Sequence, residues 1–156
     1  MTRYLDYETV VAINLEYCGI GAGAIDKNGI LGALAQLEQG IGQREFYPTL
    51  WDKAAVLLRG LAATQYFSDG NKRTAVLSAD AFLEANGLRL KVVDPDESEH
   101  VVRRVAAGNA SIPETAQWYR SICKRTPFYL WHSLKYRLVD WGNVRDENSV
   151  IHGERD

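Results

Sequence analysis

The sequence predicts an all-α domain, a compact helical bundle with room for a short β-hairpin or strand. Apolar residues recur at helical spacing along most of the 156-residue chain. Capping patterns precede several of these apolar runs, and only residues 88–92 alternate with a period of two. A chain of this length fits one domain that buries a sufficient core without disulfides or metals.

Two helices are expected before the first connector. Asp6 is placed to cap the first helix, which ends near the glycine-rich stretch 19–24, and that stretch predicts a loop. Asn28 begins the second helix, which stops before Gly40. The inward residues are Val10, Ile13 and Tyr17 in the first helix and Ile30, Leu34 and Leu37 in the second.

The centre of the chain predicts two buried helices joined by a short loop. Residues 43–48 form an exposed connector, and Thr49 with Asp52 then resembles a capping box for the first of these helices. That helix ends at residues 65–70, and a second helix opens at Asn71.

The last predicted elements lie beyond Gly87. Residues 88–92 predict a strand, a turn at 94–96 leads into a helix, and Ser111 with Glu114 forms another capping box. Residues 128–141 are rich in aromatic side chains and ambiguous in type, and the chain from Gly142 is polar.

Composition and charge exclude several classes of protein. Eighteen basic and twenty acidic residues leave a net charge of −2, with a pI of about 5.9, so direct DNA binding is not expected. The sequence shows neither a membrane-spanning apolar run nor a signal peptide, and Cys18 and Cys123 lack zinc-site spacing. We therefore expect a soluble cytoplasmic protein without membrane association.

Residues 65–73 are the one stretch whose residue types indicate a binding or catalytic site. A helix N-terminus presents unpaired N–H groups and partial positive charge, and the basic residues Lys72 and Arg73 in its first turn make sense if an anion binds there. Gly70 would let the backbone approach that anion, and Asp69 is placed to hold Mg²⁺ between phosphate oxygens. A helix cap at Asn71 beside a solvated basic pair would explain the same residues. Residue spacing alone favours this purely structural interpretation over an anion site.

The run Gln65-x-Phe67-x-Asp69-Gly70-Asn71-Lys72-Arg73-Thr74 resembles the Fic/Doc family pattern HxFx(D/E)GN(G/K)R. Lysine after the asparagine resembles the Doc branch, HxFxDGNKRT. The resemblance covers roughly residues 3–123, and so implies a Fic/Doc-like domain over residues 1–123. Residues 124–156 would then form a C-terminal aromatic extension and polar tail.

The resemblance implies a role for each motif residue. Phe67 would anchor the loop in the core, Asp69 would bind Mg²⁺, and Arg73 would contact the phosphates of ATP or another nucleotide. Gly70 and Asn71 would form the anion hole. Lys72 in place of glycine implies kinase-like transfer of the γ-phosphate rather than AMP transfer (AMPylation).

The same resemblance implies partners. A protein such as a translation factor would be the target, and a small antitoxin would neutralise the chain as the toxin of a toxin–antitoxin pair. Residues 43–48 lie where the family has a flap that docks the target by strand addition, although a plain surface loop is an equal alternative. The aromatic residues of the tail would suit a homodimer or an antitoxin if they are exposed together.

Gln65 departs from the family pattern, which has a histidine general base at this position. A carboxamide cannot accept the proton of an acceptor hydroxyl, and loss of a general base costs about 10²–10⁴-fold in rate. Three alternatives stay open: a catalytically silent nucleotide- or antitoxin-binding protein, transfer to a small acceptor that is already anionic, or a slow Doc-like toxin.

Overall fold

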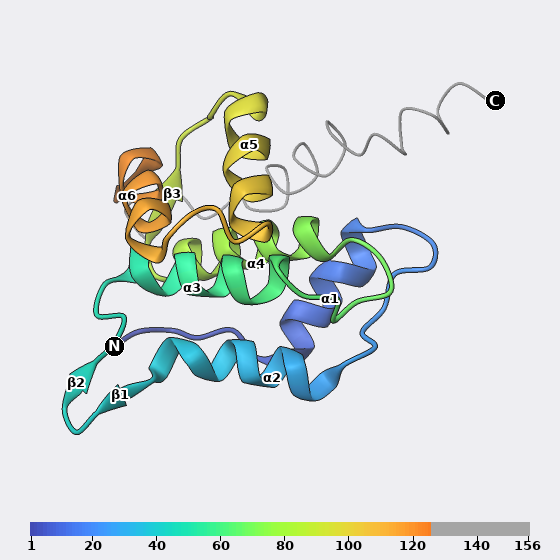
Figure 1. Ribbon diagram of the computed structural model, residues 1–156, viewed down its shortest axis with the longest axis horizontal. Helices are drawn as coiled ribbons and strands as arrows, with labels where there is room; N and C mark the ends of the chain where they lie inside the picture. Colours follow the sequence, from blue (N-terminus) through green and yellow to red (C-terminus); the bar gives the residue numbers. More distant parts are fainter. Residues whose placement is uncertain (126–156) are drawn as a thin grey trace.

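The computed structural model describes residues 1–125, which form six α-helices, one 3₁₀ turn and two short sheets (Figure 1). The helices are α1 (Tyr7–Tyr17), α2 (Lys27–Ala35), α3 (Leu50–Ala62), α4 (Asn71–Ala85), α5 (Pro95–Ala106) and α6 (Ile112–Ile122), with η1 at Gln36–Glu38. The strands are β1 (Gly40–Ile41), β2 (Arg44–Glu45), β3 (Leu88–Leu90) and β4 (Cys123–Arg125). The prediction of an all-α domain is confirmed. The predictions for residues 128–141 and for the polar tail lie outside the described residues.

The helices begin where their capping residues stand. The Asp6 carboxylate accepts a hydrogen bond of 2.8 Å from the Thr9 N–H, and both predicted capping boxes are formed, at the starts of α3 and α6. The second helix begins at Lys27, one residue before the predicted Asn28. The reason is that Asp26, which precedes it, caps the helix through a 2.8 Å bond from the Gly29 N–H.

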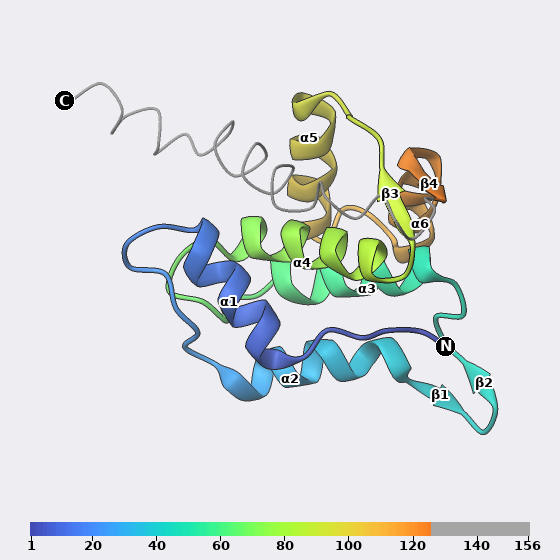
Figure 2. The same cartoon turned by 180° about the vertical axis from the view of Figure 1, so that it is seen from behind.

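Helices α3 and α4 form the centre of the molecule. Helices α1 and α2 cover one side of this pair, and α5 and α6 pack on the other (Figures 1 and 2). The central side chains with essentially no exposure include Leu57, Leu58 and Leu61 of α3 and Ala79, Phe82 and Leu83 of α4. Among residues 1–125, no helix combines the length and the apolar composition that crossing a bilayer requires.

Two antiparallel strand pairs complete the fold. In the hairpin, Gly40 pairs with Glu45 and Ile41 with Arg44, so the predicted connector 43–48 supplies the second arm of a hairpin. In the other pair, Leu90 of β3 pairs with Cys123 of β4. Strand β3 was predicted, whereas β4 was not, and its pairing continues past the predicted boundary at residue 123 to Arg125.

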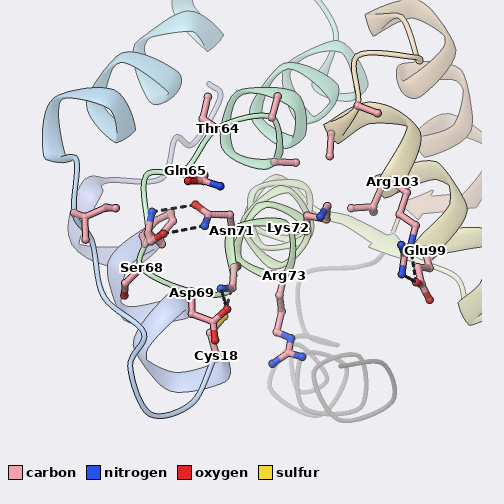
Figure 3. A pocket seen from close by; sticks show the side chains of 18 residues that line it. Cys18, Thr64, Gln65, Ser68, Asp69, Asn71, Lys72, Arg73, Glu99 and Arg103 are labelled. Carbon is pink, nitrogen blue, oxygen red and sulfur yellow. Dashed lines mark hydrogen bonds and ion pairs between the residues drawn. The ribbon is translucent and has the colours of Figure 1, made fainter. Parts of the chain in front are cut away.

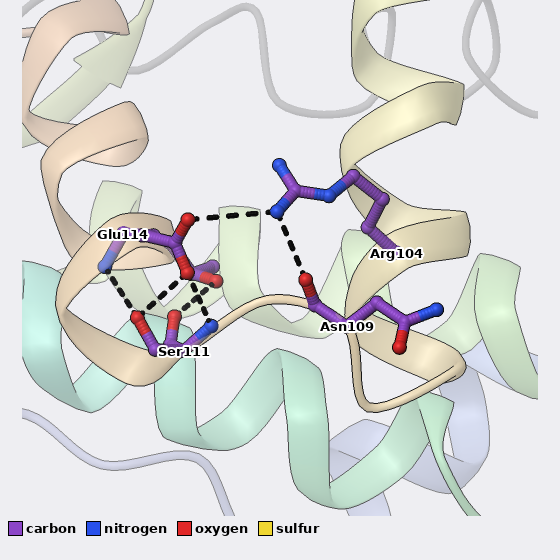
Figure 4. Close-up of polar contacts among 5 residues, drawn as sticks. Arg104, Asn109, Ser111 and Glu114 are labelled. Atoms are coloured by element: carbon purple, nitrogen blue, oxygen red, sulfur yellow. Dashed lines mark hydrogen bonds and ion pairs between the residues drawn. The ribbon is translucent and has the colours of Figure 1, made fainter.

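The turn between α5 and α6 is held by a polar cluster (Figure 4). Glu114 accepts hydrogen bonds of 2.8 Å from both the N–H and the hydroxyl of Ser111. The Arg104 guanidinium donates to the Asn109 carbonyl at 2.9 Å and lies 3.5 Å from the Glu114 carboxylate. These contacts fix α5, one wall of the cavity described next, relative to α6.

Candidate functional site

A cavity of about 850 Å³ opens where α3 ends, α4 begins and α5 packs above them (Figure 3). Every residue that the sequence singled out lies on its wall: Gln65, Phe67, Asp69, Gly70, Asn71, Lys72 and Arg73. Helix α5 contributes the opposite wall. The charged lining consists of three basic side chains and two acidic ones, Lys72, Arg73 and Arg103 against Asp69 and Glu99.

The loop before α4 turns sharply at Gly70, which caps the helix with φ of 75°. The first bond of the helix runs from the Thr74 N–H to the Gly70 carbonyl at 2.8 Å. The preceding N–H groups, those of Asn71, Lys72 and Arg73, belong to the first turn, which has no carbonyl within the helix to pair with. Their partial positive charge makes this end of α4 suited to an anion.

Asp69 directly precedes Gly70 in this turn and is exposed to solvent. Its Oδ1 accepts a 2.6 Å hydrogen bond from the Gly70 N–H, which sets the direction of the carboxylate. The other carboxylate oxygen leaves Asp69 with capacity for a cation, and Mg²⁺ is commonly held by one or two carboxylates together with phosphate oxygens. The donor set therefore fits a magnesium ion that is bound jointly with a phosphate.

Asn71 uses its side chain to hold the loop. Its Oδ1 accepts from the Phe67 N–H and its Nδ2 donates to the Phe67 carbonyl, both at 2.9 Å. Phe67 itself is 1% exposed and belongs to the main hydrophobic core. What Asn71 can offer an anion is therefore its backbone N–H, while its carboxamide fastens the loop to the buried Phe67.

Gly70 is required for a reason that the sequence did not show. A Cβ at this position would collide with the side chain of Cys18 and would lie 3.5 Å from Nδ2 of Asn14, both on the α1 side of the loop. The space that the glycine frees is thus filled by α1. Close packing against α1 is therefore a structural reason for the glycine, and the anion-binding role expected for Gly70 stays a prediction.

Lys72 and Arg73 point in different directions (Figure 3). Lys72 is exposed, extends toward the α5 side of the cavity, and makes no hydrogen bond or ion pair with residues 1–125. Arg73 is half-buried, and its Nη1 donates a 3.0 Å bond to the Tyr17 carbonyl at the end of α1. On α5, Glu99 and Arg103 form an ion pair at 2.5 Å, which no sequence motif indicates.

Gln65 is exposed and lies on the cavity wall near Asn71 (Figure 3). The glycine-rich loop after α1 runs alongside residues 66–68, which follow Gln65. The Ile25 N–H donates to the Tyr66 carbonyl at 2.8 Å, and the Ser68 N–H donates to the Gly23 carbonyl at 2.9 Å. The loop that carries the candidate residues is therefore paired along one edge.

Sequence reasoning missed Asn14, which lies on α1 beneath this loop. Its Nδ2 donates hydrogen bonds of 2.9 Å to the Asp69 carbonyl and to Oγ1 of Thr74. A signal was present, because Asn14 stands four residues after Val10 and next to Ile13, on the apolar side of a predicted helix. A polar residue at such a position needs buried partners.

The fold and the cavity define a helical domain whose two central helices are joined by a loop that opens a pocket at the N-terminus of the second. Residues 4–83, which include every candidate residue, match the sequence model of the Fic/DOC family. The chain is also 37% identical over 118 residues to "Toxin Doc" of Mycolicibacterium smegmatis (strain ATCC 700084 / mc(2)155), a match that covers 74% of this chain and 90% of the relative. The chain belongs to the Fic/DOC family.

Proposed function

We propose that this protein is a Doc-like phosphotransferase, which takes a phosphate-containing group from ATP and acts as the toxin of a toxin–antitoxin pair. The observation that carries the proposal is the cavity at the N-terminus of α4, which the motif residues line together. The N–H groups of Asn71, Lys72 and Arg73 would bind phosphate oxygens through the positive end of the helix.

Asp69 would hold Mg²⁺ beside the phosphates. Its carboxylate is already oriented by the Gly70 N–H, so little ordering of this side chain is needed when a cation binds. When bound, the ion would neutralise charge that develops on the phosphate oxygens during transfer.

Lys72 favours transfer of the γ-phosphate over transfer of AMP. This preference rests on the resemblance of Lys72 to the lysine of the Doc motif. The exposed amine of Lys72 is available to a phosphate, because residues 1–125 give it no partner that a phosphate would have to displace. AMP transfer is the alternative reaction within the same class. The mass of the transferred group distinguishes the two.

Gln65 would slow the reaction or change its acceptor. A carboxamide can orient an acceptor by hydrogen bonding but cannot take its proton, so a hydroxyl acceptor would react about 10²–10⁴-fold more slowly than with a general base. A slow toxin that acts on a protein such as a translation factor and an enzyme for an anionic small acceptor both follow from this site.

The name of the relative, "Toxin Doc", supports an antitoxin as a partner of this chain. We propose that the antitoxin acts in the cytoplasm by covering the cavity or its rim. A homodimer stays a prediction that rests on the tail aromatics.

A second candidate function is that of a catalytically silent protein that binds a nucleotide or an antitoxin. Gln65 favours it, because the side chain faces the cavity and has no titratable group in the neutral range. This candidate predicts binding of ATP without any product.

Mass spectrometry of a cell extract incubated with ATP, Mg²⁺ and the protein tests the proposal. The native chain, Gln65→His and Asp69→Ala would be compared. A target that gains the mass of one phosphate or one AMP with the native chain, and not with Asp69→Ala, is the expected result. A gain with Gln65→His alone would support the silent binder, and no gain with either would contradict transferase activity.

A further inference from the structure

We propose that Asn14 of α1 is a positioning residue for the site, because its carboxamide fixes the peptide group that orients the Asp69 carboxylate. The inference rests on the proposed function, in which that carboxylate holds Mg²⁺. Nothing in the motif points to it, since Asn14 lies 55 residues away from Asp69 in the sequence.

The geometry joins Asn14 to one peptide group of the loop. Nδ2 of Asn14 donates to the Asp69 carbonyl at 2.9 Å, and the N–H of the next residue, Gly70, donates to Oδ1 of Asp69 at 2.6 Å. The carbonyl of Asp69 and the N–H of Gly70 belong to the same planar peptide group. Asn14 therefore holds the plane whose other edge directs the carboxylate.

The direction of the Asn14 amide is set by its partners. A backbone carbonyl only accepts hydrogen bonds, so the Asp69 carbonyl requires Nδ2 rather than Oδ1 to face the loop. In that orientation Nδ2 also donates to Oγ1 of Thr74 in the first turn of α4. Asn14 thus ties the loop and the helix to one point on α1.

Asn14 is costly to bury. It is 0% exposed, and its Oδ1 has no hydrogen-bond partner within residues 1–125. An apolar side chain of similar size would avoid a buried acceptor without a partner. The role that explains the asparagine is its donor group, which satisfies two acceptors of the loop and of α4.

Two further contacts, from the last residue of α1 and from its C-cap Cys18, reach the same segment. Sγ of Cys18 lies 3.7 Å from the Gly70 carbonyl, and the Tyr17 carbonyl accepts from Arg73. The second half of α1 therefore acts as a template for residues 69–74. Among these contacts, the one from Asn14 is made to the peptide group that orients Asp69.

The test is the gain in ATP affinity that Mg²⁺ provides, measured by calorimetry in saturating Mg²⁺ and in EDTA. We expect Asn14→Leu to remain folded. Its gain in ATP affinity from Mg²⁺ should be about tenfold smaller than that of the native protein, which is the order for one buried hydrogen bond. Ile13→Ala is the matched control. It removes a buried side chain of the same helix that packs on Leu77 and Ala81 rather than on the loop, so it lowers stability and keeps the gain.

Four results would decide the matter. An unchanged gain in Asn14→Leu overturns the inference alone, and so does an equal loss in Ile13→Ala. If Asn14→Leu does not fold, Asn14→Ala removes the donor without adding bulk or charge, so the gain must fall there too. A native protein that binds no ATP overturns the proposed function together with this inference.

Discussion

At the scale of single residues, Gly70 combines a left-handed backbone with close packing. Its φ of 75° is a conformation that costs an L-residue about 1–2 kcal/mol. Cys18 also occupies the space beside its Cα, so a side chain there must displace part of α1. Both effects act at the turn that presents the N–H groups of α4 to the cavity.

Gly70→Ala is therefore expected to lower the free energy of unfolding by more than the conformational cost of about 1–2 kcal/mol. The matched control is Gly87→Ala, because Gly87 has a φ of 79° and no atom within 4 Å of an added Cβ. Urea denaturation of the two variants separates the cost of the left-handed backbone from the cost of the collision with Cys18. Equal losses would show that the contact with Cys18 costs nothing.

A second substitution tests the same contact from the other side. Cys18→Gly in the Gly70→Ala background removes the side chain that collides with the new methyl group. The two substitutions are expected to be coupled, with the double variant more stable than the sum of the single effects. Additive losses would place the strain elsewhere.

The candidate residues were predictable because they are contiguous, while the residues that support them were not. A run from Gln65 to Arg73 between two predicted helices must lie at one place in the fold. Asn14 and Cys18 reach that place through the packing of α1 on α4, which helical periodicity does not specify. The direction of Arg73, toward Tyr17, was beyond prediction for the same reason.

At the scale of elements, the hairpin β1–β2 is joined to the core through Lys53 of α3. Lys53 is 1% exposed, and its Nζ donates to the Leu37 carbonyl and to the Glu45 carboxylate, both at 2.8 Å. The side chain of Glu45 is 50% exposed, so solvent weakens the ion pair. The bond to the Leu37 carbonyl is the buried part of the link.

Lys53→Met is expected to destabilise the protein by about 1–3 kcal/mol, since the Leu37 carbonyl loses its partner while the apolar stem is kept. Hydrogen exchange at residues 40–45 should rise with it. Glu45→Gln is the control, because it removes the ion pair but retains an acceptor for Nζ. A hairpin that exchanges equally fast in both variants would mean that the buried bond does not hold it.

The capping box of α6 makes part of the stability depend on pH. The pKa of Glu114 is lowered from its usual 4.5, first by the Ser111 N–H and then by the Ser111 hydroxyl. Because the folded-state pKa lies below the unfolded one, the contribution is complete above the unfolded pKa. It is lost as pH falls through the folded pKa.

Glu114→Gln keeps the capping geometry and removes the titration. Its free energy of unfolding is expected to fall less than that of the native protein between about pH 6 and about pH 3, where a free glutamate would titrate. Thermal unfolding across this range measures the difference. Parallel curves for the two proteins would contradict a role for the carboxylate.

At the scale of the whole molecule, local sequence signals predicted the helices. They did not predict the pairing of strands that are distant in the sequence. Capping residues located the starts of α3 and α6, and the alternation at 88–92 located β3. Its partner β4 follows α6 directly, and Leu90 and Cys123 are brought together by the packing of α6 on α3. A three-residue strand such as Cys123–Arg125 has no pattern of its own to detect.

We propose that the N-terminus of α4 binds the phosphates of a nucleotide. A crystal structure of the native protein with Mg²⁺ and a non-hydrolysable ATP analogue tests it most directly. The expected result is phosphate oxygens on the N–H groups of Asn71, Lys72 and Arg73, with the cation on Asp69. A nucleotide bound elsewhere, such as in the second cavity of about 490 Å³ beside Trp51 and Arg125, would contradict it.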